Sequence, residues 1–394
     1  MKRHLFTSNK IRLVSSALAV VFALPLFWKG LAGLYTWFSP FILLHSVIVL
    51  KSFVWMNFLG MVVLVFSFMR KRWFCRYMCP VGYGCDLVSK YSIRRNFKLS
   101  RVPDFSKGLA IASLVAAAAG LPLFILLDPM ALFHGFFSVF SGNKPFWVIV
   151  SFSGLPVLLA IHLFIPGVWC ARICPLGGLQ DLFGMARQAI RKAGSEKKRN
   201  SEFKGSGRRL FIASGLGIAS GLLIPRYLHT SSYQRIRPPA SLPSDLFNVL
   251  CIRCSNCVKA CPTQIIDNNT DTSDPVAWMT PVVHFENSYC LENCNFCGRV
   301  CPTGAISPFS IDAKKKIVMA LAVVHLEACL LTKRSECDRC KEACKYDAIK
   351  IEYLAEKNQM APVVDNDKCI GCGACAVICP PFTIDMIPPE EIGF

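Results

Sequence analysis

The spacing of the cysteines between residues 251 and 379 constrains this chain more than any other feature, because sixteen of its 21 cysteines lie there in four groups of four. The groups are Cys251, Cys254, Cys257 and Cys261; Cys290, Cys294, Cys297 and Cys301; Cys329, Cys337, Cys340 and Cys344; and Cys369, Cys372, Cys375 and Cys379. The first and fourth groups read C-x2-C-x2-C-x3-C-P, the pattern with which bacterial proteins bind [4Fe–4S] clusters. Three thiolates of such a group face one cluster, and the fourth ligates its neighbour. The spacing therefore predicts iron bound by these cysteines, in four [4Fe–4S] clusters.

The second and third groups depart from this pattern. The first gap is three residues long in the second group and seven in the third, and the third group ends at Cys344-Lys345 without a proline. A structural or empty third site is the alternative to four clusters. Zinc is disfavoured because its structural sites use two separated cysteine pairs, and disulfides because cysteines so close in sequence are poorly placed to pair. The groups can pair adjacently or in a nested order, and the sequence leaves both open.

Apolar residues are concentrated before residue 226. The chain is 53% hydrophobic, and its mean hydropathy is +0.42. Four apolar stretches are long enough to cross a bilayer, from about Leu13 to Trp37, Ser52 to Met69, Gly108 to Leu127 and Phe146 to Trp169. The net charge of +19 comes from basic segments between them, which favours membrane orientation over nucleic-acid binding. We therefore predict an α-helical domain in the bacterial inner (cytoplasmic) membrane, with a cytoplasmic N-terminus.

The two halves of this region form a repeat. Cys75-x3-Cys79-Pro80 and Cys170-x3-Cys174-Pro175 share the motif C-x3-C-P-x-G, and each follows two apolar stretches. Two spans return the chain to the same side of a membrane, so parallel repeats would bring these four thiols together at the cytoplasmic face. They could hold a fifth cluster, form two redox dithiols, or be structural. Cys85 has no counterpart in the other half, and we do not expect it to be a ligand.

The sequence predicts five segments. They are a four-helix membrane domain at 1–185, a basic linker at 186–209, a fifth transmembrane or signal-anchor helix at 210–225, a Pro-containing linker at 226–247, and an α+β tandem bacterial-ferredoxin-like domain at 248–394. The basic linker ends in Arg208-Arg209, and two arginines before a Gly-rich apolar run are typical of a twin-arginine export signal. The alternative is a plain fifth span. Export would place the ferredoxin-like domain in the periplasm.

Both parts of the chain resemble known ferredoxin-type proteins. Residues 1–185 resemble NapH/MauN-type membrane ferredoxin proteins through Arg72-Trp73-Phe74-Cys75-Arg76-Tyr77-Met78-Cys79-Pro80 and Trp169-Cys170-x3-Cys174-Pro175. Residues 205–394 resemble NapG/MauM-type polyferredoxins through the twin arginine, Arg237-Pro238-Pro239 and the four cysteine groups. The resemblance implies a fusion of two usually separate components of a quinol dehydrogenase system, which pass electrons from membrane quinol to a periplasmic oxidoreductase such as nitrate reductase. The chain lacks the cytoplasmic ferredoxin tail often found after the fourth span.

The leading functional hypothesis is electron transport from the quinone pool through the clusters to a periplasmic oxidoreductase or electron carrier. Quinol oxidation needs a proton acceptor, and His45, His134 and His162 are candidates because histidine titrates near neutrality. For each of them, a packed or interfacial histidine is the alternative. A second hypothesis is an electron donor for the maturation of a partner metalloenzyme, without a quinol site, and a third is a structural anchor with a redox-inactive metal. No Gly-rich nucleotide-binding motif or C-x2-C-H haem motif occurs in the sequence.

Overall fold

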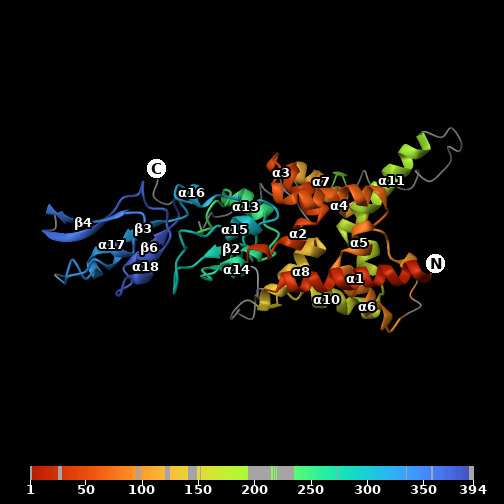
Figure 1. Ribbon diagram of the computed structural model, residues 1–394, viewed down its shortest axis with the longest axis horizontal. Coiled ribbons are helices and arrows are strands. Elements are labelled where there is room, and N and C mark those ends of the chain that lie inside the picture. Colours follow the sequence, from red (N-terminus) through yellow and green to blue (C-terminus); the bar gives the residue numbers. More distant parts are fainter. Residues whose placement is uncertain are drawn as a thin grey trace. The chain divides into compact units, whose positions relative to one another are not determined.

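Residues 2–193 form a succession of mostly short helices, and short helices alternate with short strands after residue 243 (Figure 1). The computed structural model describes residues 2–24, 29–94, 97, 99–119, 125–140, 149–150, 152–193, 214–215, 217, 219, 235–271, 273–333, 335–355 and 358–389. The chain divides into a helical unit and a cysteine-rich unit. The helical unit comprises Met1–Thr230, Asn248–Asn256 and Pro302–Gly304, and the cysteine-rich unit Ser231–Phe247, Cys257–Cys301 and Ala305–Phe394.

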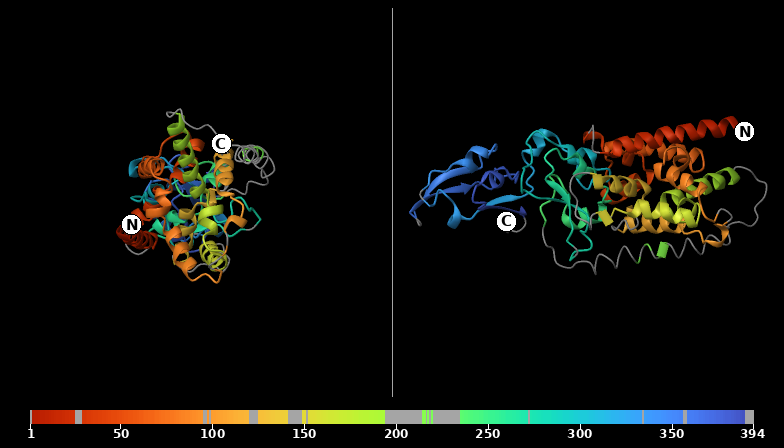
Figure 2. Two further views of the ribbon diagram at one scale, coloured as in Figure 1. Left: turned by 90° about the vertical axis from the view of Figure 1, so that its right-hand side faces the viewer. Right: turned by 90° about the horizontal axis from the view of Figure 1, so that it is seen from below.

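The helical unit is built from the following α-helices: α1 (Lys2–Ala23), α2 (Leu34–Trp37), α3 (Pro40–Leu50), α4 (Phe58–Met69), α5 (Trp73–Tyr77), α6 (Pro80–Lys90), α7 (Ser106–Ala118), α8 (Pro129–Phe137), α10 (Gly154–Phe164) and α11 (Pro175–Ala193). Single 3₁₀ turns join them at Lys29–Leu31, Trp55–Asn57, Leu99–Arg101, Ile125–Leu127 and Ser138–Phe140, and a π-helical turn, η6, spans Trp169–Ile173. Both views in Figure 2 show α1 on the outside of this unit, where it packs against α5 and α6.

Proline starts the helices at equivalent places in the two sequence repeats. These helices are α3, α6, α8 and α11, which begin at Pro40, Pro80, Pro129 and Pro175. Proline suits the first helical position because that position needs no backbone N–H and has the φ angle that the ring imposes. The preceding residue caps the helix: Asp128 accepts a hydrogen bond from the Met130 N–H at 2.8 Å, and the Cys79 sulfur accepts one from the Gly82 N–H at 3.3 Å. The repeated sequence thus gives the same local structure twice.

The core of the helical unit is apolar and closely packed. Its largest fully buried side chains include Phe41, Phe74, Ile125, Met130, Leu176 and Leu179. Helix α11 lies along α7 so closely that a Cβ atom added at Gly178 would be 2.1 Å from the Ser106 carbonyl oxygen. This backbone approach brings the second C-x3-C-P loop, which leads into α11, against the start of α7.

The predicted membrane spans are absent from the described residues. Helices α4, α7 and α10 have 12, 13 and 11 residues, so α4 is about 18 Å long, whereas the bilayer core is about 30 Å thick. Helix α1 has 22 residues, but its first half is interrupted by charged residues. Within the described ranges, no helix is both long and apolar enough to cross a membrane. The prediction of an α-helical membrane domain is therefore wrong, and the predicted inner-membrane localisation and sidedness, which depend on those spans, are overturned with it.

The physical reason is that hydropathy averaged along the sequence does not detect where a helix ends. In the apolar stretch from Gly108 to Leu127, helix α7 ends at Ala118. In the stretch from Ser52 to Met69, α4 begins only at Phe58, after a 3₁₀ turn. Some apolar residues of these stretches are buried in the unit, as Val63, Ala116 and Leu158 are, whereas others, such as Phe58 and Val157, are exposed.

The cysteine-rich unit alternates short helices with three two-stranded antiparallel sheets. The helices are α13 (Ser244–Leu250), α14 (Asn256–Ala260), α15 (Phe296–Val300), α16 (Ile311–Lys314), α17 (Arg339–Ala343) and α18 (Ala374–Ile378), with a 3₁₀ turn at Leu326–Ala328. The strands are β1 (Ile266–Asn268), β2 (Pro281–Val283), β3 (Leu321–Val324), β4 (Ile349–Leu354), β5 (Gln359–Val364) and β6 (Ile384–Ile387). They pair as β1–β2, β3–β6 and β4–β5, with Ile266 opposite Val283, Leu321 opposite Ile387, and Ile349 opposite Val364.

Several predicted segments lie outside the described residues. Arg208 and Arg209, most of the fifth predicted helix at 210–225, and residues 226–234 of the second linker are among them. The basic linker predicted at 186–209 begins inside α11, which continues to Ala193.

Candidate functional site

All four cysteine groups build the same local structure. In each group the third cysteine occupies the second position of a five-residue helix; these cysteines are Cys257 in α14, Cys297 in α15, Cys340 in α17 and Cys375 in α18. The fourth cysteine caps the C-terminus of that helix in extended conformation in α15, α17 and α18, with ψ between 101° and 113°. The chain therefore turns at the fourth cysteine, which separates its thiol from the other three. The irregular second and third groups adopt this geometry as fully as the regular fourth group.

In groups three and four, the fourth cysteine of each group lies beside the first three cysteines of the other group. One pocket is lined by Cys329, Cys337, Cys340 and Cys379, so the last thiol of group four faces the first three of group three. Conversely, burial and then the nearby thiolates of Cys372, Cys369 and Cys344 raise the pKa of Cys375 to about 12. Two sets of four thiols result, each with three members from one group and one from the other, which fits the requirement of a pair of [4Fe–4S] clusters.

Group one contributes its fourth cysteine to group two in the same way. The pKa of Cys290 is raised by burial and by the thiolates of Cys261 and Cys294, although Lys314 opposes the shift. Burial, then Cys290 and Cys294, also raises the pKa of Cys297. The last thiol of group one therefore lies beside the thiols of group two. These neighbours favour adjacent pairing of the groups over the nested order.

Lys314 is buried against a thiol of this unit, which its sequence context does not indicate. Its side chain is only 1% exposed, and its ammonium group donates to the Cys290 sulfur at 3.2 Å, to the Cys294 carbonyl at 2.9 Å and to the Leu291 carbonyl. It belongs to the run Lys314-Lys315-Lys316, and three consecutive lysines predict a turn exposed to solvent. Its position as the last residue of α16 is the only local signal, because its partners are more than 19 residues away in sequence. A buried cation beside a thiolate set lowers the free energy of negative charge there.

A direct backbone contact joins the two pairs of thiol sets. The Cys290 N–H donates to the Cys372 carbonyl oxygen at 2.9 Å. Tyr346 lies at the same place: burial, then the thiolates of Cys372 and Cys290, raises its pKa to about 12. Its hydroxyl is buried and has no hydrogen-bond partner in the described part of the chain. The second and fourth cysteine groups are therefore neighbours.

The two C-x3-C-P loops of the helical unit converge on one cavity. Cys75, Cys79, Cys170 and Cys174 all line this cavity, which has a volume of about 450 Å³. The gathering of these four thiols is as the repeat predicts. The two loops match in detail, because a Cβ atom added at Gly82 would lie 3.4 Å from the Cys75 carbonyl oxygen, and one added at Gly177 would lie 3.0 Å from that of Cys170. Burial raises the pKa values of Cys75, Cys79 and Cys174.

Polar side chains from α11 hold the first loop against the second. Gln180 donates to the Cys75 sulfur at 3.1 Å and accepts from the Phe74 N–H at 3.1 Å. The Arg72 guanidinium binds both oxygens of Asp181, at 3.0 and 2.5 Å, and donates to the Cys170 carbonyl at 3.1 Å. Arg12, Lys71, Arg72 and Arg76 also line the cavity, so cations surround the thiols.

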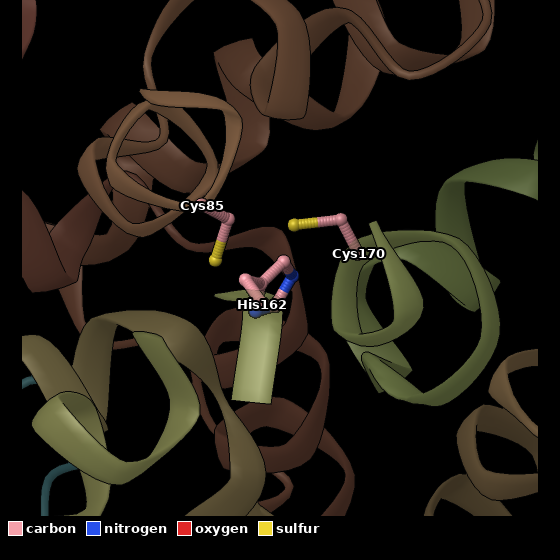
Figure 3. Close-up of side chains that lie close together, drawn as sticks. All are labelled: Cys85, His162 and Cys170. Atoms are coloured by element: carbon pink, nitrogen blue, oxygen red, sulfur yellow. The ribbon is translucent and has the colours of Figure 1, made fainter. Parts of the chain in front are cut away.

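Cys85, which the repeat gives no role, lies with His162 and Cys170. Figure 3 shows these three side chains pointing toward one another, and their sulfur and nitrogen atoms all lie within 4.8 Å of each other. Hydrogen bonding to Cys170, then burial, raises the pKa of Cys85. The hydrogen bond donated by Cys85 lowers the pKa of Cys170 to about 6. Cys85 comes from α6, His162 from α10 and Cys170 from η6, so only the folded chain brings them together.

The other two candidate histidines have different environments. His45 is fully buried, with its ring nitrogens 2.8 Å from the Phe41 carbonyl and 2.7 Å from the Ser113 hydroxyl. Burial lowers the pKa of His45 to about 4, which makes it a weak proton acceptor near neutrality. His134 lies 3.1 Å from the Asn256 side-chain oxygen through Nδ1. The three histidines are thus dispersed among α3, α8 and α10 and do not form one site.

Two domain families match the sequence. Residues 250–305 and 333–382 match the family described as 4Fe-4S dicluster domain. Residues 52–100, 147–193 and 295–319 match the family described as 4Fe-4S binding domain, so the second match includes both C-x3-C-P loops.

Curated proteins of two kinds are similar to the chain. The methylamine utilization ferredoxin-type protein MauM of Methylophilus methylotrophus is 38% identical over 149 residues, which cover 36% of this chain and 66% of the relative. MauM of Methylorubrum extorquens is 30% identical over 42% of this chain and 79% of its own length. The ferredoxin-type protein NapG of Escherichia coli K12 is 35% identical over 44% of this chain and 81% of its own length. No solved structure matches the chain.

Proposed function

Since the chain belongs to the family of ferredoxin-type 4Fe–4S electron-transfer proteins that includes MauM and NapG, we propose that its cysteine-rich unit holds four [4Fe–4S] clusters and conducts electrons between two redox partners. The family supports the NapG/MauM part of the resemblance noted in the sequence. The fusion with a NapH/MauN-type part stays a prediction. A bound [4Fe–4S] cluster accepts and donates one electron at a time.

The observation that carries this proposal is the hydrogen bond from the Cys290 N–H to the Cys372 carbonyl oxygen. It joins the thiol sets of groups one and two to those of groups three and four. A chain of four sites conducts only if its two pairs are close, and this contact makes them neighbours. We propose that electrons cross between the pairs at Cys290 and Cys372, next to Tyr346.

The thiol sets follow from the exchange of fourth cysteines. We propose that Cys329, Cys337, Cys340 and Cys379 hold one cluster, and Cys344, Cys369, Cys372 and Cys375 its neighbour. Cys261 joins Cys290, Cys294 and Cys297 in a third set. The cysteine pattern assigns Cys301 to the remaining three of group one. Backbone N–H groups donate to several of these sulfurs, including that of Ile306 to Cys301 at 3.4 Å and that of Ala348 to Cys344 at 3.3 Å, and such bonds stabilise negative charge on sulfur.

Metal analysis of the anaerobically purified chain tests the proposal. Four clusters require about 16 iron atoms per chain, with electron paramagnetic resonance signals from the reduced clusters. Cys344→Ser removes a ligand from the set that contains Cys372, so about four iron atoms should be lost while the pocket of Cys329 and Cys379 keeps its iron. A full-length chain with no iron, or with zinc in its place, would refute the electron-transfer function.

For the electron donor we propose a quinol and for the acceptor a partner oxidoreductase. The quinol is supported by the resemblance noted for the C-x3-C-P loops, and among the candidate histidines His134 and His162 keep the role of proton acceptor. Anaerobic addition of duroquinol should bleach the visible absorption of the clusters. An unchanged spectrum, in protein that dithionite reduces fully, would exclude a quinol as the direct donor.

A further inference from the structure

Three side chains that can bind a metal converge inside the helical unit, apart from the iron–sulfur sites proposed above. Cys85, His162 and Cys170 offer two sulfurs and one ring nitrogen, all within 4.8 Å of one another (Figure 3). Cys85 is 1% exposed and His162 is fully buried. Cys170 is partly buried and also lines the cavity of about 450 Å³. The group therefore has a closed inner side and an open outer side.

The hydrogen bonding of His162 leaves one nitrogen available to a metal. His162 Nδ1 lies 2.8 Å from the Leu158 carbonyl, which can only accept, so Nδ1 carries the proton. Nε2 is then the atom with a free lone pair, and it is buried close to the Cys170 thiol. Histidines that bind metals are commonly held in this way, with one ring N–H donated to a carbonyl and the other nitrogen on the metal.

We propose that Cys85, His162 and Cys170 bind a single zinc ion. Two thiolates and one imidazole are a donor set that zinc prefers, and three protein ligands leave its fourth position for water or another ligand. Two sulfurs bound to one tetrahedral zinc lie roughly 3.8 Å apart, given Zn–S bonds of about 2.3 Å. Small side-chain rotations bring atoms within 4.8 Å to that separation. Binding releases the thiol protons, so that the ion is held by two thiolates and a neutral imidazole.

A fourth ligand of the zinc ion would come from the cavity that Cys170 lines. Arg12, Arg72 and Asp86 are among the other residues that line it. A metal ion has an entry path from this side, because Cys170 is the least buried of the three ligands. The opposite side is closed by Cys85 and His162.

This use of Cys170 competes with a fifth iron–sulfur cluster on the C-x3-C-P loops. A cluster would need the thiol of Cys170 together with those of Cys75, Cys79 and Cys174. The zinc ion needs Cys170 with Cys85 and His162 and leaves three thiols on the cavity wall. The two possibilities therefore predict opposite effects of replacing Cys75 and Cys85. The inference is independent of the four clusters proposed for the cysteine-rich unit, and a zinc-bound His162 leaves His134 as the candidate proton acceptor.

The experiment measures zinc and iron in the full-length chain, purified anaerobically from cells supplied with zinc. We expect about one zinc per chain, absent from Cys85→Ser and His162→Gln and retained in the matched control Cys75→Ser, which changes a thiol of the same cavity. X-ray absorption at the zinc edge should show two sulfur ligands and at least one nitrogen ligand. Tryptophan fluorescence shows whether each variant is folded, since six of the seven tryptophans lie before residue 170.

Three results would overturn the zinc site. They are wild-type protein without zinc, a folded Cys85→Ser variant that keeps its zinc, and loss of zinc from Cys75→Ser. Loss of about four iron atoms from Cys75→Ser, with none lost from Cys85→Ser, would assign Cys170 to a cluster instead. Iron in the cysteine-rich unit tests the proposed function separately, so either idea can fail without the other.

Discussion

Ser39 and Asp128 occupy equivalent positions in the two sequence repeats, and they bind each other: the Ser39 hydroxyl donates to the Asp128 carboxylate at 2.7 Å. Each residue also caps the helix that follows it, since Ser39 accepts from the Ile42 N–H at 3.4 Å and Asp128 from the Met130 N–H at 2.8 Å. Both are essentially inaccessible to solvent. A repeated capping position thus also joins α3 to α8.

The Asp128 carboxylate should make the helical unit less stable as the pH rises. Burial raises the pKa of Asp128 to about 6, above the value of about 4 expected in the unfolded chain. The folded state therefore holds the proton more tightly than the unfolded state. The free energy of unfolding that this proton contributes is lost as the pH rises from about 4 to about 6. Asp128→Asn should remove this dependence and stabilise the unit at pH 7 by up to about 3 kcal/mol.

Urea unfolding followed by tryptophan fluorescence at pH 4.5 and 7.5 measures this effect. The variant and the wild type should differ at pH 7.5 and converge at the lower pH. The Asn oxygen can accept from the Met130 N–H, and its amide N–H can donate to the Ser39 hydroxyl, so the cap of α8 and the contact with Ser39 can both be kept. A difference that is equal at both pH values would show that Asp128 does not titrate in this range.

Replacing Arg72 should destabilise the helical unit strongly. Arg72→Ala leaves the Asp181 carboxylate, whose side chain is 10% exposed, without its bidentate partner, and removes the donor to the Cys170 carbonyl. Breaking a buried ion pair in this way costs about 3 kcal/mol. The control is Arg12→Ala, which breaks the ion pair to Asp86, the residue equivalent to Asp181 in the other repeat. Because the Asp86 side chain is 56% exposed, this change should lower the free energy of unfolding by less than about 1 kcal/mol. Equal losses in urea unfolding would contradict the assigned difference in burial.

A methyl group at Gly178 should disrupt the packing of α11 on α7. The added Cβ atom would be 2.1 Å from the Ser106 carbonyl oxygen, and backbone atoms cannot move aside as a side chain can. Gly178→Ala should therefore cost about 3 kcal/mol of unfolding free energy or prevent folding. Gly84→Ala is the matched control, because its Cβ atom would meet only the Leu159 side chain, at 3.4 Å. It should be neutral or slightly stabilising, and a tolerated Gly178→Ala would argue against this helix contact.

Lys314 should raise the reduction potential at the thiol set of group two. Its ammonium group lies 3.2 Å from the Cys290 sulfur and is buried, so it stabilises the extra negative charge of the reduced state. Lys314→Met should lower that potential by an amount on the order of 100 mV. This is the effect of removing one positive charge about 6 Å from the centre of the cluster at an effective dielectric constant of about 20. A redox titration followed by electron paramagnetic resonance measures the shift. Lys315→Met provides the control, since the Lys315 side chain is 64% exposed.

The cysteine spacing predicted that the four groups would share a local structure, because that structure depends on a short backbone pattern. A five-residue helix with a cysteine at its second position, and another as its C-cap, recurs in groups two, three and four. Even the long gap between Cys329 and Cys337 does not disturb it, because the last three cysteines of the group keep their spacing. The pairing of the groups required the folded chain, since it depends on which loops lie beside each other.

The helical unit shows where hydropathy fails. The apolar stretch Ser52–Met69 has the composition of a transmembrane helix, yet α4 covers only its last 12 residues. Composition is a sum over residues, whereas a span also requires one unbroken helix. The ends of these helices are set by prolines, caps and turns whose positions an average along the sequence does not register.

The sequence by itself determined which residues are chemically equivalent: four cysteine groups, two C-x3-C-P loops, and the capping pairs Ser39-Pro40 and Asp128-Pro129. Such equivalence is a property of short segments, whose conformation follows from a few neighbouring residues. Only the tertiary structure decided that Lys314 is buried against Cys290 and that Cys85 lies with His162 and Cys170. Those contacts join Lys314 to a residue 24 positions away and Cys85 to residues 77 and 85 positions away. The free energy that holds them comes from the packing of whole helices, which no local pattern encodes.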